Sequence, residues 1–399
     1  MTFMPNIPMS SPDITDLERE AVLDVLAGGQ LSLGPALSKF EHEFARYIGT
    51  KHAIGVSSGT SGLHICIIAA GCQPGDAVVT SPFSFVASAN VILYERGIPL
   101  FVDVDEITGN IDPNHVVEAI ESVNQDGIDS EFLPRSINDG QEKSTGRIGA
   151  FLPVHAFGQP ADIEAPVEAA RKAGVAVIED ACEAIGAFYK SRIVGGLGDA
   201  AVFAFYPNKQ MTTGEGGIIV TNEDTWETLA RSVRNQGRDV FDEWLNHSRL
   251  GYNYRIDELS AALGLVQLAR IEELLQKREQ VAHWYKERLQ AVEGVVLPQI
   301  AATTTRLSWF VYVIRLASAD VRKKVMLGLN QRSVPSRPYF SPIHLLKPYV
   351  ERFGYKRGDF PVAERLGDVS LALPFSSVMT EGQVDYVCES LKETIQASS

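Results

Sequence analysis

Short runs of apolar residues recur along the chain and alternate with longer segments of helical spacing. Several runs are apolar throughout, so both faces of the strands that they form should be buried. Buried strands separated by helices are typical of a parallel or mixed sheet covered by helices, which is an α/β fold. The expected strands are residues 53–56, 77–80, 99–102, 150–154, 175–178, 200–205 and 218–220.

Segments with helical spacing precede and follow these strands, and those that follow predict a second domain. Residues 13–27 and 37–48 each carry one apolar stripe before the first strand, and residues 258–291 carry a long stripe that predicts one helix. Beyond it we expect a strand at 310–315, a helix at 319–331, a loop rich in proline and aromatic residues, and a final helix after Thr380.

The change of pattern suggests a domain boundary near the long helix. We therefore expect residues 1–257 to form a large domain, which would hold any bound ligand at the ends of its strands, and residues 258–399 a smaller C-terminal α+β domain. Residues 122–147 are polar and rich in turn-forming residues, and they predict an exposed excursion from the large domain.

Composition and charge narrow the classes of partner. A formal net charge of -14 argues against nucleic acid and against an anionic membrane surface. The four cysteines have no C-x-x-C spacing, which favours a reducing compartment. No signal peptide is visible and no run reaches the ~20 apolar residues that span a bilayer. We expect a cytoplasmic protein without a metal site.

Polar residues at the ends of the expected strands are candidates for a site, because ligands bind at the carboxyl ends of parallel strands. They are residues 57–61, His155, Asp180 and Lys209. Residues 57–61 are mostly hydroxyl residues and glycine at the start of a helix, which suits an anion such as phosphate. Plain capping of the helix explains the same residues.

Lys209 is the only Lys or Arg in residues 193–230 and lies between buried strands. It could form a Schiff base, pair with Asp180, or lie on a surface loop. A lysine, a carboxylate and an anion site together suit pyridoxal phosphate, through its aldehyde, ring nitrogen and phosphate. Phe83 or Phe85 could stack on such a ring.

Nine motifs then occur in order along nearly the whole chain: SSGTSGLH, SPFSFVASAN, FVDVDEITGNIDP, LPVHAFGQPADI, IEDACEAIGA, GDAAVFAFYPNKQMTTGEGG, LGYNYRIDELSAALGLVQL, SRPYFSPIH and LALPF. They resemble the DegT/StrS-type nucleotide-sugar aminotransferases, a branch of the fold-type-I pyridoxal-phosphate enzymes. The resemblance implies a three-layer large domain around a mostly parallel sheet, and a role in making polysaccharide or antibiotic sugars.

The resemblance also assigns roles in holding pyridoxal 5'-phosphate. Lys209 is expected to be the catalytic Schiff-base lysine, and Asp180 the partner of the ring nitrogen. Phe85 is expected to stack on the ring. Glu183 occupies a position often held by Gln, which contacts the phenolic oxygen of the cofactor. Family members that are dehydratases have His in place of Lys209, so transamination is favoured.

The phosphate of the cofactor has further expected ligands. Thr60 and Ser61 resemble residues of the phosphate cup, and Asn253 resembles an asparagine that reaches the cofactor of the neighbouring subunit. This implies a homodimer with shared active sites. Some relatives have Ser five residues before the lysine as a phosphate ligand, where this chain has Ala204.

The activity implied by the resemblance is a two-half, ping-pong transfer of an amino group from glutamate to a nucleotide-linked keto-sugar. Candidates for substrate contact are His155, Arg337, Tyr339 and His344. Packing or support of the cofactor is the alternative for the two histidines, and a solvated loop is the alternative for Arg337. A pyridoxal-phosphate-binding regulator without turnover, amination of a keto-cyclitol and another pyridoxal-phosphate reaction are the alternatives.

Overall fold

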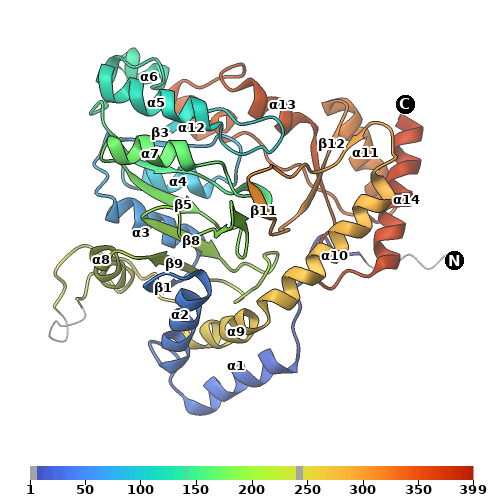
Figure 1. Ribbon diagram of the computed structural model, residues 1–399, viewed down its shortest axis with the longest axis horizontal. Helices are drawn as coiled ribbons and strands as arrows, with labels where there is room; N and C mark the ends of the chain where they lie inside the picture. The colour runs from blue at the N-terminus through green and yellow to red at the C-terminus, as the bar shows by residue number, and fades with distance from the viewer. Residues whose placement is uncertain (1–6, 141, 240–245, 399) are drawn as a thin grey trace.

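The computed structural model describes residues 7–140, 142–239 and 246–398 (Figure 1). A seven-stranded sheet with the order β1-β9-β8-β5-β4-β2-β3 lies at its centre. The neighbours from β8 to β3 are parallel, and β9 is antiparallel to both β1 and β8. The strands are β1 (His52–Val56), β2 (Ala77–Thr80), β3 (Ile98–Phe101), β4 (Ile148–Leu152), β5 (Ala176–Asp180), β8 (Ala200–Ala204) and β9 (Gly217–Thr221).

Every predicted strand of this sheet is present, with ends within two residues of the expected ones. Almost all residues of these strands are buried, as their uninterrupted apolar sequences predicted. The predicted α/β fold with a mostly parallel sheet is confirmed.

Helices cover both faces of the sheet (Figure 1). Side chains of α3 (Gly59–Ala69), α4 (Ala87–Tyr94) and α8 (Asp224–Arg234) form one core cluster with the strands. The other face packs against α5 (Pro113–Asp126) and α7 (Glu164–Lys172) at one end, and against α2 (Pro35–Ile48) and α9 (Glu258–Ala269) at the other. The first helix, α1 (Asp16–Gly28), packs against α9.

A second core lies in the C-terminal part, toward the right in Figure 1. Its antiparallel sheet has the order β10-β12-β13, with β10 (Val295–Val296), β12 (Tyr312–Leu316) and β13 (Ser370–Leu373). The sheet packs with α10 (Ile271–Leu289), α11 (Ala319–Gln331) and α14 (Glu381–Ser398). Ile7, near the start of the chain, is buried in this same core.

Shorter elements connect the two parts of the chain. The small sheet β11-β6-β7 joins Thr304–Arg306 (β11) to Phe188–Tyr189 (β6) and Arg192–Ile193 (β7). The remaining short helices are α6 (Arg135–Asn138), α12 (Lys347–Phe353) and α13 (Pro361–Val369).

The prediction of a single helix over 258–291 was wrong. The segment forms α9 and α10, and Arg270 between them leaves helical geometry at φ -99° and ψ 5°. The Arg270 guanidinium donates to Asp13 Oδ1 at 2.9 Å and to Glu18 Oε1 at 2.7 Å. These ion pairs with the N-terminal segment hold the chain where the helix breaks. The break could not be predicted, because the apolar stripe continues across it. The boundary at 257/258 stays a prediction.

The prediction of an exposed excursion over 122–147 was also partly wrong. Leu133 and Ile137 are buried in the core that includes β2, β3 and α5. Arg135 pairs with Asp359 at 2.7 Å, and Glu142 pairs with Arg352 at 2.9 Å. The segment therefore packs onto the chain around α12 through these apolar side chains and ion pairs, although most of its sequence is polar.

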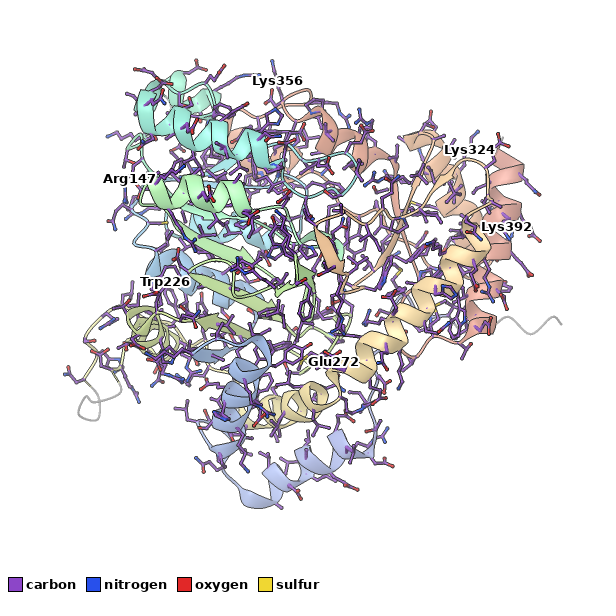
Figure 2. The ribbon with its side chains drawn as sticks, in the orientation of Figure 1. Arg147, Trp226, Glu272, Lys324, Lys356 and Lys392 are labelled. Atoms are coloured by element: carbon purple, nitrogen blue, oxygen red, sulfur yellow. The ribbon has the colours of Figure 1, made fainter. Side chains whose placement is uncertain are left out.

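The charged side chains of Lys356 and Lys392 lie near the outer edge of the molecule (Figure 2). None of the described helices is long and apolar enough to cross a membrane. Within the described part of the chain, no group of three or more His, Cys, Asp or Glu side chains could hold a metal ion.

Candidate active site

A cavity of about 450 Å³ lies where β5 and β8 end and α3 begins. Its wall includes the predicted residues Thr60, Phe85, Asp180, Glu183, Lys209 and Tyr339. The parallel strands β5 and β8 are neighbours in register, with Asp180 opposite Val202, so their carboxyl ends open into one space. The sheet topology thus brings together residues that lie far apart in the sequence.

Lys209 follows β8 on the loop that returns to β9, and its side chain is 14% exposed. The Nζ atom lies 3.5 Å from Glu183 Oε1 and 4.0 Å from the centre of the Phe310 ring. A carboxylate and an aromatic face both attract a cation. A direct ion pair between Lys209 and Asp180 was one of the alternatives from the sequence. In the structure, Lys209 pairs with Glu183 instead.

Asp180 ends β5 and is 7% exposed. Its Oδ1 atom accepts a hydrogen bond from the Cys182 amide at 3.2 Å. Burial raises the pKa of Asp180, against the hydrogen bonds from Cys182 and the charge of Lys209, which lower it. A buried carboxylate with a raised pKa is ready to accept a cationic partner such as a pyridinium N–H.

Glu183 is buried and uses both carboxylate oxygens. Oε2 accepts a hydrogen bond from the Phe157 amide at 2.8 Å, and Oε1 faces Lys209. Burial raises the pKa of Glu183, while the charge of Lys209 lowers it. The backbone bond therefore fixes the orientation of the carboxylate toward the lysine.

The first turn of α3 meets the cavity, as an anion site requires. Ser58 caps the helix, because its side chain accepts from the Ser61 amide at 3.1 Å and the Ser61 hydroxyl donates to the Ser58 carbonyl at 2.8 Å. Thr60 lies in the cavity wall and Ser61 does not. The Ser61 hydroxyl thus serves the capping that the sequence left as the alternative to phosphate binding.

Gly59 allows α3 to begin directly against β8. A Cβ atom at Gly59 would lie 2.7 Å from both Ala204 Cβ and Cys182 Sγ, which no real Cβ contact tolerates. Ala204 is itself in the cavity wall beneath this turn. An anion held at this turn would meet the helix amides and Thr60, and it would meet the apolar Ala204 where the resemblance led us to look for a serine.

Phe85 is 64% exposed, although it lies in the cavity wall. Tyr206, also in the wall, is 52% exposed. Two exposed aromatic side chains beside a cavity are suited to pack on a flat ligand. Phe83 is buried against Phe157 and Phe340. Of the two phenylalanines that the sequence offered for stacking on a ring, only Phe85 is therefore accessible.

Of the four candidates for substrate contact, only Tyr339 lies in the cavity wall. Burial raises the pKa of its hydroxyl. Arg337 is exposed, lies outside the wall, and donates to the carbonyl of Ser336 at 3.0 Å. Direct contact between substrate and Arg337 is therefore not supported within this chain.

The two histidines among these candidates are fully buried and lie outside the wall. His155 Nε2 contacts Glu179 at 3.1 Å, and its Nδ1 accepts from the Ala161 amide at 3.0 Å. His344 Nε2 contacts Glu364 at 3.0 Å. Each ring satisfies a buried carboxylate, which favours a packing role for both histidines over contact with the substrate.

Asn253 is exposed and lies outside the wall of the cavity. Its backbone forms an antiparallel bridge with Asn235. The side chain is thus accessible to another molecule, and its expected role in a neighbouring subunit stays a prediction.

Two residues that hold Lys209 in place escaped the sequence analysis. Phe310 was read only as part of a strand, and it covers Lys209. Arg278 on α10 is 1% exposed and donates to the carbonyl of Lys209 at 2.6 Å and to that of Phe310 at 3.1 Å. Burial lowers the pKa of Arg278 to about 9, which leaves it cationic at neutral pH. A charged residue on the buried side of a helix was the only available hint.

Comparison with known proteins identifies the family. The sequence profile of the DegT/DnrJ/EryC1/StrS aminotransferase family matches residues 12–392. The chain belongs to this family. GDP-perosamine synthase of Caulobacter vibrioides is 35% identical over 399 residues, which cover 99% of this chain and 100% of that protein. A Geobacillus stearothermophilus protein named pleiotropic regulatory protein is 34% identical over 97% of this chain and 98% of its own length.

Solved structures of the family have the same fold. The crystal structure of S. venezuelae DesV matches with a TM-score of 0.86 at 29% identity, over 98% of this chain and 99% of that one. The family, the fold and the class of pyridoxal-phosphate-dependent aminotransferase predicted from the sequence are thereby confirmed.

The residues of the cavity fit pyridoxal phosphate. An amine, a buried carboxylate and a helix N-terminus surround one space, and aromatic side chains, the exposed Phe85 and Tyr206 among them, line it. Each matches one part of the cofactor: Lys209 the aldehyde, Asp180 the ring nitrogen, Phe85 the ring face, and the first turn of α3 the phosphate.

Proposed function

We propose that this aminotransferase transfers an amino group from glutamate to a nucleotide-linked keto-sugar in two half-reactions of a ping-pong mechanism. The observation that carries the proposal is the cavity in which Lys209 and Asp180 face one space beside the N-terminus of α3. A relative named GDP-perosamine synthase supports a nucleotide-linked sugar as the acceptor.

Bound in this cavity, pyridoxal phosphate supplies an aldehyde for the amino group and a ring that takes up electron density when a C–H bond breaks. Lys209 Nζ removes the proton from Cα of the donor and returns a proton to the sugar carbon that receives nitrogen. Asp180 holds the ring nitrogen in its protonated form, and Thr60 with the α3 amides binds the phosphate.

Glu183 and Arg278 position the lysine. Glu183 attracts the Nζ atom from one side, and Arg278 holds the backbone carbonyl of Lys209. The amine is thereby presented to the cavity from a fixed loop, as a proton-transferring group requires.

We infer that the active unit is a homodimer in the cytoplasm, in which Asn253 reaches the cofactor phosphate of the neighbouring subunit. The exposure of Asn253 and its absence from the cavity of its own chain support this arrangement.

One alternative is a regulator that binds the cofactor without turnover, because one relative is named pleiotropic regulatory protein. Lys209, Asp180 and the cavity are all in place in this chain, which favours turnover. A regulator would keep the colour of the bound cofactor but would not lose it to an amino donor.

The test is a panel of GDP-, UDP- and dTDP-linked 3-keto and 4-keto hexoses with glutamate, read by the mass of the amino-sugar product. The absorbance of the enzyme near ~420 nm should fall with glutamate and return with the correct acceptor. Colour that glutamate leaves unchanged would contradict the proposal and favour the regulator. Colour that falls and is restored only by a keto-cyclitol would show a different acceptor.

A further inference from the structure

His64 lies on α3, the helix whose first turn meets the cavity, and it is 2% exposed. Its Nε2 atom lies 2.8 Å from Glu95 Oε1, and its Nδ1 atom lies 3.1 Å from the Tyr254 hydroxyl. An ionised carboxylate only accepts, so Nε2 donates to Glu95, and Nδ1 of the neutral ring accepts from Tyr254. Both nitrogens of this buried ring are therefore used, and one of them holds a tyrosine from a distant part of the sequence.

Three tyrosine rings surround the imidazole of His64. The centre of the Tyr252 ring lies 4.9 Å from the centre of the imidazole, that of Tyr94 at 5.2 Å and that of Tyr254 at 5.9 Å. Tyr252 and Tyr254 stack on each other, with their ring centres 4.9 Å apart and 9° between the planes. Both rings also pack on the core cluster that α3 forms with the sheet. The two tyrosines are thus held against α3 by packing as well as by the hydrogen bond.

Asn253 lies between these two tyrosines in the sequence. Alternate side chains of an extended segment point to opposite sides, so Asn253 points away from α3, and it is exposed. Backbone bonds hold the segment on both edges, because the Tyr254 amide donates to the Arg234 carbonyl at 3.0 Å and the Tyr254 carbonyl accepts from the Ser57 amide at 2.8 Å. The direction of the Asn253 side chain is therefore set by the contacts of its two neighbours.

A phosphate in the cavity meets little positive charge from its own chain. The charged residues among the described ones of the wall are three carboxylates and one amine: Asp180, Glu183, Glu215 and Lys209. Ala204, beneath the first turn of α3, offers no side-chain donor. A neutral amide donor that reaches the phosphate from the neighbouring subunit would supply a large part of the missing bonds, so its exact position should affect affinity.

We propose that His64 positions Asn253 for the cofactor phosphate of the neighbouring subunit. It does so by holding the Tyr254 hydroxyl, and with it the direction of the segment that carries Asn253. His64 acts through Tyr254 and contacts neither cofactor nor substrate. Loss of this contact lowers the affinity of the neighbour's cavity for the cofactor and leaves the cavity of the same chain unchanged. This role rests on the proposed function, since it describes what holds the shared site of the homodimer in shape.

The first test measures affinity in cofactor-free protein. It is titrated with pyridoxal phosphate and, separately, with pyridoxal, which lacks the phosphate, and the colour near ~420 nm is followed. Tyr254→Phe removes only the hydroxyl that His64 holds and keeps the stacked ring. Tyr386→Phe is the matched control, because the Tyr386 hydroxyl also makes one bond, to the Arg332 carbonyl at 3.1 Å, and its ring packs in the C-terminal core.

Tyr254→Phe should raise the Kd for pyridoxal phosphate by about three- to tenfold, as the loss of one hydrogen bond does, and change that for pyridoxal by less than about twofold. Asn253→Ala should raise the Kd for pyridoxal phosphate by about tenfold or more. The double variant should match Asn253→Ala, because both changes remove the same contact. His64→Asn keeps an acceptor near the position of Nδ1 and should bind more tightly than His64→Leu. Tyr386→Phe should equal the wild type.

The second test uses hybrid dimers purified through two different affinity tags. Lys209→Ala in one chain leaves a single cavity that gives the colour of the bound cofactor. With Tyr254→Phe in the same chain as Lys209→Ala, the altered segment serves the remaining cavity, whose Kd should rise as in the full variant. With Tyr254→Phe in the other chain, the Kd should equal that of the hybrid without it.

An unchanged Kd in Tyr254→Phe, beside a raised one in Asn253→Ala, would overturn the role of His64 alone. An equal loss for pyridoxal and pyridoxal phosphate would do the same, as would a loss in the cavity of the altered chain, because a merely structural role produces either result. If Asn253→Ala binds pyridoxal phosphate as tightly as the wild type, the shared site of the proposed function is wrong, and the role of His64 with it.

Discussion

Lys209 Nζ lies 3.5 Å from Oε1 of Glu183, on a loop whose carbonyl is held by a buried arginine. The Phe157 amide fixes the other oxygen of Glu183, so the carboxylate cannot turn away without losing that bond. The contact connects residues that follow two neighbouring strands, and it directs the amine into the cavity.

Lys209→Ala should lower turnover by at least about 10³-fold, because no other amine lines the cavity among the described residues to form the Schiff base or move the proton. The measurement is kcat with glutamate and the best acceptor. Lys190→Ala is the matched control, since Lys190 is 43% exposed and pairs with Glu164 at the surface. More than a tenth of wild-type activity in Lys209→Ala would be incompatible with a catalytic lysine.

Asp180→Asn should lower kcat by about 10²- to 10³-fold, as for the loss of a buried charge that stabilises the reacting state. The variant should still fold, and the pKa of Asp180 tells whether the substitution raises or lowers stability. Burial raises the pKa of Asp180, so its charged form costs stability at neutral pH in the cofactor-free protein. The Tm of cofactor-free Asp180→Asn should therefore equal or exceed that of wild type.

Adding pyridoxal phosphate separates this explanation from simple misfolding. The cofactor should raise the Tm of wild type more than that of Asp180→Asn, because only the carboxylate offers a charge to the ring nitrogen. A cofactor-free Asp180→Asn that is several degrees less stable than wild type would show that the carboxylate serves the fold instead.

Much of this site could be predicted from the sequence, because its residues follow directly after strands that are apolar throughout. Lys209, Asp180 and Thr60 belong to this group, and sheet topology alone brings them together. Ser61 was assigned to the anion site, since capping and phosphate binding use the same residue types at the same position. Only the geometry separates the two roles.

The roles of the two histidines, of Phe310 and of Arg278 could not be predicted from the sequence, because each depends on a tertiary contact. His155 and His344 were candidates for substrate contact, but each is fully buried and contacts a buried carboxylate, that of Glu179 or Glu364. Phe310 contacts the Lys209 amine and Arg278 bonds the Lys209 carbonyl, and no local pattern marks a contact of such long range. Tertiary partners, rather than secondary structure, were what the sequence concealed.

A shared active site predicts complementation between inactive variants. Lys209→Ala and Asn253→Ala should each be impaired under limiting cofactor, but a hybrid dimer would contain one site with both residues intact. Mixing them under conditions that exchange subunits should restore up to about a quarter of wild-type activity. Mixing Lys209→Ala with Asp180→Asn should restore nothing, because both residues belong to the cavity of one chain. No recovery in the first mixture would argue against shared sites.

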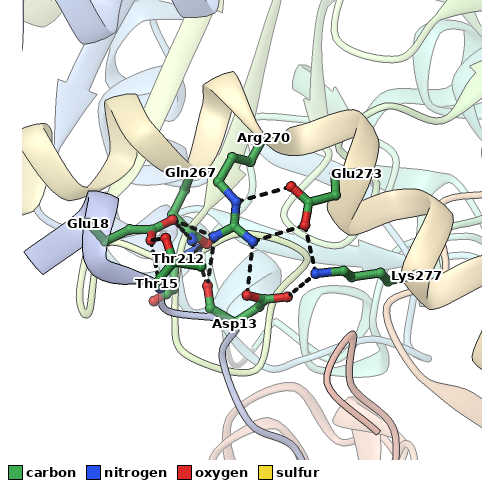
Figure 3. Close-up of polar contacts among 8 residues, drawn as sticks. All are labelled: Asp13, Thr15, Glu18, Thr212, Gln267, Arg270, Glu273 and Lys277. Carbon is green, nitrogen blue, oxygen red and sulfur yellow. Dashed lines mark hydrogen bonds and ion pairs between the residues drawn. The ribbon is translucent and has the colours of Figure 1, made fainter. Parts of the chain in front are cut away.

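Asp13 and Glu18 bond Arg270 and Gln267 and so anchor the N-terminal segment against α9 and α10 (Figure 3). This anchor should make stability depend on pH through Glu18, which is 1% exposed. Burial raises the pKa of Glu18, but hydrogen bonds from Thr15, Arg270 and Gln267 outweigh it and lower the pKa to about 2. A folded-state pKa below the ordinary value means that the stabilisation is complete above about pH 4.5. It is lost as the pH falls from there toward 2.

Glu18→Gln should therefore lower the Tm by a few degrees at pH 7, where the carboxylate is charged and bonded to Arg270 at 2.7 Å. The difference from wild type should shrink steadily below pH 4.5, as wild type loses the same interaction. Thermal unfolding at pH 7, 5, 4 and 3.5 measures this, with Glu20→Gln as the control because Glu20 is exposed on the same helix. A difference in Tm that stays constant over this range would mean that packing of the side chain, rather than its charge, stabilises the anchor.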